Sequence, residues 1–215
     1  GDRPHQDQFR FQEFCFYEHF DFNNRFLPIF SFIFDIFEKR FGDNAGSLFL
    51  RSLRKIDFDE LDEQHYGDNF ISSLLVIMMK SNNVKYIKSV DDENQTLFHI
   101  AAKFGNISNK TLDMLIEKIK VAKVSWQNLL NVRTQKGKTI LMIFAGKGNF
   151  EAIKRLGQLK DNIETRDIYG NNILHEILQD TKMTNDKLIE GIVHIGNAHR
   201  ELIIQRNRKG ENAFL

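Results

Sequence analysis

Hydrophobic positions between residues 26 and 41 follow the period of a helix. Isoleucines among them widen the apolar surface, so we predict a largely buried helix. Gly42–Asn44 is expected to end it, and a second helix is predicted over residues 47–56. The phenylalanines that recur in steps of three or four residues, and so share one helical face, are Phe26, Phe30, Phe34, Phe37 and Phe41.

The segment before this helix is rich in phenylalanine but has no clear period, and we predict no regular element over residues 1–24. An acidic stretch at 57–63 is typical of a solvated linker or helix face. We group residues 1–65 as a Phe-rich, mainly helical N-terminal module. It either caps the end of the following domain or binds another protein or a lipid surface independently. We favour the cap, because its helix is apolar nearly all round.

A single phrase recurs four times in the second half of the chain. It reads DDENQTLFHIAAKFGN from Asp91, TQKGKTILMIFAGKGN from Thr134, DIYGNNILHEIL from Asp167 and NRKGENAFL from Asn207. Its glycine-like positions are 94, 137, 170 and 210, so the steps between copies are 43, 33 and 40 residues. Additional residues are therefore predicted near 122–130 and near 181–185. A degenerate copy is predicted over residues 71–90.

Each part of the phrase has a mechanical role. Glycine permits left-handed backbone in the turn, and a threonine or asparagine two residues later can cap the next helix. His99 and His175 are expected to hydrogen-bond to the backbone of the adjoining turn, and small residues such as Ala145 let neighbouring helices approach closely. Gly148–Asn149 is expected to form the turn between paired helices. The predicted caps are Thr96, Thr139, Asn172 and Asn212.

A period of about 33 residues with a T-P-L-H-x-A phrase is the ankyrin signature. The chain resembles ankyrin-repeat proteins over residues 71–215. The resemblance implies an all-α solenoid of paired antiparallel helices with β-hairpin-like fingers, preceded here by the helical Phe-rich cap. We assign residues 66–215 to about four or five repeats, the last of them truncated at Leu215, and expect the chain to be a fragment.

Within this class the chain is similar to the inhibitor-of-NF-κB (IκB) family and its insect-virus relatives. The similarity is carried by the acidic run and TLFHIAA between Asp91 and Ala102, by LLNVRTQKGKTIL, and by NIETRDIYGNNILH. The positions of the two insertions agree with that family. No D-S-G-x-x-S degradation signal is present. The resemblance therefore implies a member that is not released by phosphorylation.

The IκB resemblance implies that the stacked repeats grasp a partner protein, such as a Rel-type transcription factor. By their position in the fingers and on the concave face, nine residues are predicted to contact it, with Tyr169 as the energetic hot spot. The predicted partner-binding residues are Thr134, Gln135, Lys136, Asp167, Ile168, Tyr169, Asn207, Arg208 and Lys209.

Composition limits the possible roles. Thirty basic and 29 acidic side chains leave a net charge of +1, which does not support general binding to nucleic acid or a membrane surface. Residues 118–138 are locally basic; they could contact an acidic partner or nucleic acid, but we favour a solvated helix face. The single cysteine, Cys15, excludes a disulfide framework, and no apolar run is long enough to cross a bilayer. We expect a cytoplasmic or nuclear protein.

Residues that imitate catalytic or cofactor motifs have simpler explanations. Gly137-Lys138-Thr139 resembles the end of a phosphate-binding loop, but Val132 stands where that motif requires glycine. His194 and His199 lack the further ligands of a metal site, and no motif surrounds Cys15. We therefore predict no enzyme activity, no cofactor and no metal. The predicted function is a non-catalytic scaffold in signalling or transcriptional regulation. The alternative is the ankyrin region of a larger protein, such as a channel, a multidomain enzyme or a pathogen effector.

Overall fold

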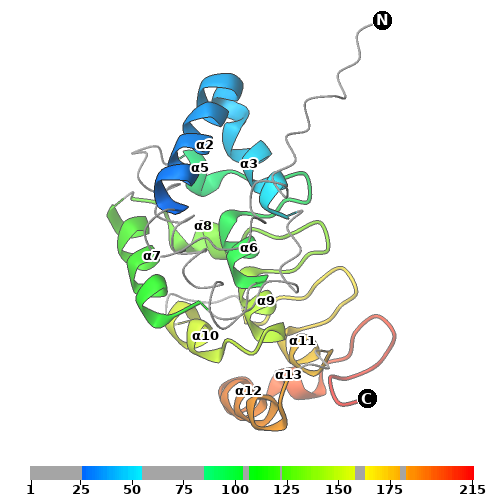
Figure 1. Ribbon diagram of the computed structural model, residues 1–215. Coiled ribbons are helices and arrows are strands. Elements are labelled where there is room, and N and C mark those ends of the chain that lie inside the picture. The colour runs from blue at the N-terminus through cyan, green and yellow to red at the C-terminus, as the bar shows by residue number, and fades with distance from the viewer. Residues whose placement is uncertain (1–25, 55–84, 104–106, 122, 158–162, 180–182) are drawn as a thin grey trace, which may run out of the picture.

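The computed structural model describes residues 26–54, 85–103, 107–121, 123–157, 163–179 and 183–215 (Figure 1). Within these ranges the regular elements are all helical, as predicted. The degenerate copy over 71–90 and the segment before residue 26 lie mostly outside them, so their predicted organisation stays a prediction. None of the described helices combines the length and the apolar character that a membrane span requires.

The N-terminal helices form an antiparallel pair. Helix α2 (Phe26–Phe41) has the predicted bounds, and a 3-10 turn, η1 (Gly42–Asn44), leads into α3 (Ala45–Arg54). Phe34 and Phe37 meet Phe49 of α3 edge to face, with ring centroids 5.2 and 6.1 Å apart. These contacts account for the predicted stripe, since aromatic pairs prefer such geometry.

The expectation that α2 is largely buried is wrong for one of its faces. Phe32 and Ile36 have exposed fractions of 66 and 43%. The helix packs mainly on α3 and η1, so only the side that carries Phe34 is covered among the described elements. The apolar residues on the opposite side face outward.

Helix α3 joins the N-terminal pair to the rest of the molecule. It packs against α5 (Lys85–Lys88) and α6 (Leu97–Lys103). Phe49, Leu50 and Leu53 are completely buried and belong to one hydrophobic cluster that continues through the later helices. The described part of the Phe-rich module therefore shares a core with the repeated phrases.

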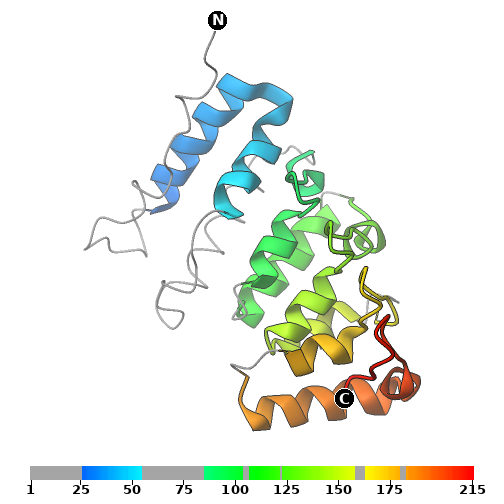
Figure 2. The same cartoon turned by 90° about the vertical axis from the view of Figure 1, so that its right-hand side faces the viewer.

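Three helix pairs follow in a stack (Figures 1 and 2). They are α6 with α7 (Asn109–Val121), α9 (Ile140–Gly146) with α10 (Phe150–Gly157), and α11 (Ile173–Gln179) with α12 (Asn185–Ala198). The first helices of the pairs contact one another in the order α6, α9, α11, and α7 contacts α10. Ala102 and Ala145, which are fully buried, allow this close approach.

Two short helices were not predicted from the sequence. Helix α8 (Trp126–Leu130) lies in the predicted insertion between the first two pairs, and α13 (Glu201–Ile204) follows α12. Leu129, Leu130 and Leu202 are almost completely buried. These leucines therefore pack both short helices onto the stack. With five and four residues, the helices are too short to show an apolar period in the sequence.

The cap of α9 allows a first test of the local structure. Thr139 has extended backbone (φ −86°, ψ 166°), and its side chain accepts a hydrogen bond from the N–H of Met142 at 3.3 Å. Thr139→Ala is expected to lower the free energy of unfolding by about 1 kcal/mol, because the N–H loses its partner. Urea denaturation measures this change. Thr139→Ser, which keeps the hydroxyl, should retain most of the stability, and equal losses in both variants would contradict the capping role.

Candidate protein-binding surface

Four turns with one hydrogen-bond pattern precede the first helix of each unit. We call residues 91–95, 134–138, 167–171 and 207–211 the four turns. In each, the N–H of the first residue donates to the carbonyl of the fifth, at 2.8 to 3.0 Å. The N–H of the fourth residue donates to the carbonyl of the first, at 2.7 to 3.1 Å. The repeated phrase thus encodes one repeated backbone conformation.

The fourth residue of every turn has left-handed backbone, as predicted. Gly137, Gly170 and Gly210 have φ angles of 75, 79 and 83°, and Asn94 takes the same conformation with φ 58°. Asparagine is one of the few other residues that adopt this region readily. At Gly137 and Gly170 a Cβ atom would also lie 2.9 Å from a backbone nitrogen of the next turn, at Ile168 and Arg208. Glycine is therefore required there for both conformation and space.

The first residue of each turn closes it with a side-chain oxygen. One carboxylate oxygen of Asp167 accepts the N–H groups of Tyr169 and Asn171, both at 2.8 Å. Asp91 and Asn207 each accept two N–H groups in the same way. Thr134 accepts one, from Lys138. This role was not predicted, although a polar oxygen three residues before the glycine position occurs in all four phrases.

Backbone hydrogen bonds join each turn to the next. The N–H of Gln135 donates to the carbonyl of Glu93 at 2.8 Å, and that of Ile168 to the carbonyl of Lys136 at 3.1 Å. The N–H of Arg208 donates to the carbonyl of Tyr169 at 2.9 Å. The turns form a continuous row although they are 33 to 43 residues apart in sequence.

Two buried histidines hydrogen-bond to the backbone of adjoining turns, as predicted, and so connect successive units. The Nδ1 atoms of His99 and His175 accept the backbone N–H of Thr96 and Asn172, both at 3.2 Å. Their Nε2 atoms then donate to backbone carbonyls of the next unit, at Val132 and Glu211, again at 3.2 Å. Burial lowers the pKa of His99 to about 4, because the charged imidazole would lose its hydration.

The second and third residues of the turns, which we call the tip residues, project from the row. They are Asp92 and Glu93, Gln135 and Lys136, Ile168 and Tyr169, and Arg208 and Lys209. The first pair is acidic, the second is polar and basic, the third is apolar and aromatic, and the fourth is basic. Ile168 and Tyr169 keep exposed fractions of 42 and 53%, which is unusual for large apolar side chains.

The nine predicted partner-binding residues thus divide into two sets. Gln135, Lys136, Ile168, Tyr169, Arg208 and Lys209 are exposed tip residues. In contrast, Thr134, Asp167 and Asn207 are the first residues of their turns, and Asp167 is only 6% exposed. The side-chain oxygens of these three hold the turn and thereby position the tips. Their predicted contact with a partner has no direct support in this arrangement.

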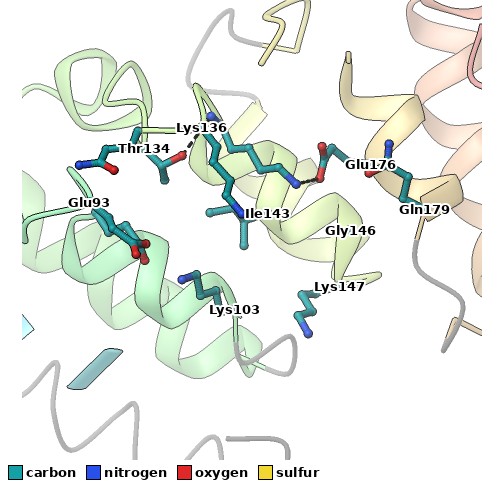
Figure 3. A pocket seen from close by; sticks show the side chains of 12 residues that line it. Glu93, Lys103, Thr134, Lys136, Ile143, Gly146, Lys147, Glu176 and Gln179 are labelled. Carbon is teal, nitrogen blue, oxygen red and sulfur yellow. Dashed lines mark hydrogen bonds and ion pairs between the residues drawn. The ribbon is translucent and has the colours of Figure 1, made fainter. Parts of the chain in front are cut away.

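A groove of about 410 Å³ lies beside the row, over the first helices of the stack (Figure 3). Its lining comes from the first and second turns and from α6, α9 and α11. Lys138 Nζ crosses from the second turn to Glu176 of α11, where it lies 2.5 Å from Oε2. Burial raises the pKa of Glu176, whose side chain is almost fully enclosed, while the nearby Lys138 opposes that shift.

Residues that imitate catalytic motifs have structural roles here. Gly137 packs beneath the third turn and the Thr139 hydroxyl caps α9, so this tripeptide is used by the repeat itself. His199 comes together with Glu164 and Glu201 rather than with His194, with potential ligand atoms within 4.8 Å of one another. Both carboxylates are exposed and Glu201 already pairs with the imidazole at 3.4 Å, an ordinary surface arrangement.

Comparisons with known proteins do not assign a family. No family model and no curated protein matches this sequence. Among solved structures, the chain is similar to one in the complex of Bd0816, a predatory endopeptidase from Bdellovibrio bacteriovorus, with the immunity protein Bd3460. The identity is 20% and the TM-score 0.43, over 65% of this chain and 70% of that chain. A similarity this low does not indicate a function.

Proposed function

We propose that the chain is an ankyrin-type, non-catalytic scaffold that binds a partner protein through the tip residues and the adjacent groove. The observation that carries this proposal is the continuous row of four turns with projecting side chains. The backbone groups and first-residue oxygens of the turns are used internally, whereas the side chains of Ile168 and Tyr169 in the third turn project outward. Such an arrangement presents side chains from distant parts of the sequence on one rigid surface, as repeat proteins do.

Tyr169 is the strongest candidate for an anchor. Its backbone is held on both sides, since its N–H donates to Asp167 and its carbonyl accepts from Arg208. The aromatic side chain nevertheless remains half exposed beside Ile168. Binding would order little besides the side chain itself, so its contact area would be gained at a small entropic cost.

The IκB-like part of the proposal rests on the sequence phrases and the positions of the insertions. It names a Rel-type transcription factor as partner and a role in signalling or transcriptional regulation, in the cytoplasm or nucleus. The second candidate is an interaction region of a larger protein with its activity elsewhere. Titrating this chain with a purified Rel-type dimer separates the two, because only the first predicts saturable binding.

Tyr169→Ala is expected to weaken partner binding by about 2 kcal/mol, roughly thirtyfold in Kd, through loss of the anchor. Isothermal titration calorimetry with the Rel-type dimer, or with a partner captured from lysate and then purified, measures this effect. The melting temperature should hardly change, because the ring is exposed. Tyr169→Phe is the matched control and should retain most of the affinity. If Tyr169→Ala binds as tightly as wild type, the turns are not the binding surface.

A further inference from the structure

The groove beside the turns carries an excess of positive charge. Among its lining residues are four lysines, Lys103, Lys136, Lys138 and Lys147, against the two carboxylates of Glu93 and Glu176. Lys103 ends α6 and Lys147 follows the last residue of α9. The negative end of a helix dipole carries roughly half a charge, so it offsets only part of the positive charge of the lysine beside it. Figure 3 places both side chains on the same side of the groove.

One buried carboxylate oxygen of a residue that lines the groove has no donor. Oε2 of Glu176 takes the Lys138 ammonium, whereas no hydrogen-bond partner reaches Oε1 within the described part of the chain. Glu176 is only 5% exposed. A buried oxygen without a donor costs on the order of 1–3 kcal/mol. A ligand that brings an N–H group to this oxygen would recover that energy.

A helical glycine keeps the space beside this carboxylate open. Gly146 ends α9, where alanine would favour the helix by about 1 kcal/mol. A Cβ atom at Gly146 would lie 3.5 Å from the carbonyl oxygen of Glu176 and 3.7 Å from its Oε2. Alanine would therefore fit, but any longer side chain would extend into the groove.

We propose that this groove binds an extended, acidic segment of a partner protein. Carboxylates of the segment would pair with Lys103, Lys136 and Lys147, and one of its backbone N–H groups would donate to Glu176 Oε1. An extended peptide supplies both features, since its backbone N–H groups alternate with its acidic side chains. The phosphates of a nucleic acid would also meet the lysines, but its backbone has no N–H group to donate to Glu176 Oε1. The inference rests on the proposed function and specifies the partner's chemistry.

The test is fluorescence anisotropy with a dye-labelled peptide of alternating glutamate and serine. Wild type should bind it with an affinity that falls as salt rises, because the pairs are electrostatic. Lys103→Gln/Lys147→Gln should weaken binding at least about tenfold, the effect of losing two charge pairs. The matched control, Lys110→Gln/Lys120→Gln on α7, removes the same charge from exposed positions outside the groove and should bind like wild type.

Two glycine variants separate charge from shape. Gly146→Ala should bind the peptide as wild type does, whereas Gly146→Leu should abolish binding by filling the groove without changing charge. Melting curves verify that each variant is folded. No peptide binding, equal binding by both double-lysine variants, or tighter binding of single-stranded DNA would each overturn the inference. If partner binding still depends on Tyr169 in that event, the proposed function stands and only the acidic segment is wrong.

Discussion

Gly191→Ala is expected to destabilise the protein by about 3 kcal/mol, because it overpacks the contact between α10 and α12. Gly191 is buried in α12, and a Cβ atom there would lie 2.2 Å from Cζ and 2.4 Å from Cε1 of Phe150. The ring of Phe150 is only 2% exposed and has little freedom to withdraw. The change should appear in urea denaturation as a lower midpoint with an unchanged m-value.

A double-mutant cycle identifies the clash as the cause. Phe150→Leu alone should be destabilising, since it leaves a cavity at the start of α10. Combined with Gly191→Ala, it should restore stability above that of the glycine variant alone, because the shorter side chain admits the new methyl group. If the two changes are simply additive, the ring does not limit residue 191. Ala152→Gly on α10 serves as a control with no expected rescue.

Lowering the pH is expected to remove about 3 kcal/mol of stability through His99. The pKa of this imidazole falls from 6.5 to about 4 on folding, so the unfolded chain binds more protons between these values. Its contribution is fully present above pH 6.5 and is lost progressively as the pH falls towards and below 4. At about 1.4 kcal/mol per pKa unit, the shift corresponds to this loss.

The measurement is the free energy of unfolding by urea at several pH values from 7 to 4. Other groups also titrate in this range, and Glu176 acts in the opposite direction because its pKa is raised on folding. His99→Gln isolates the effect, since the amide does not titrate and can still hydrogen-bond. The variant should be less stable at pH 7 but show a smaller loss on acidification. Identical pH dependence in both proteins would exclude His99 as the titrating group.

Local chemistry made much of the stack predictable. The left-handed position of the turns, the Thr139 cap and the two bridging histidines depend on residues a few positions apart, so one copy of the phrase contains the necessary information. The predicted bounds of α2 were correct for the same reason. The second helix, expected over 47–56, instead spans Ala45–Arg54, because η1 reverses the chain two residues earlier than the apolar spacing indicates.

The exposure of individual side chains was less predictable. Phe32 and Phe34 are both phenylalanines of one apolar helix, yet the first is exposed and the second buried, because α3 covers one side of α2. Likewise Asp167 and Tyr169 belong to the same predicted binding segment. The aspartate closes the turn while the tyrosine projects from it.

The sequence by itself determined a helical protein with four like turns. Period, glycine position and capping residues are local properties, and they recur in each phrase. Only the tertiary structure decided which residues meet across units. The proximity of Gly191 to Phe150, the Lys138–Glu176 pair 38 residues apart, and the groove with its unsatisfied oxygen all depend on how successive helices stack. No single phrase contains that information, because each contact is completed by a neighbour.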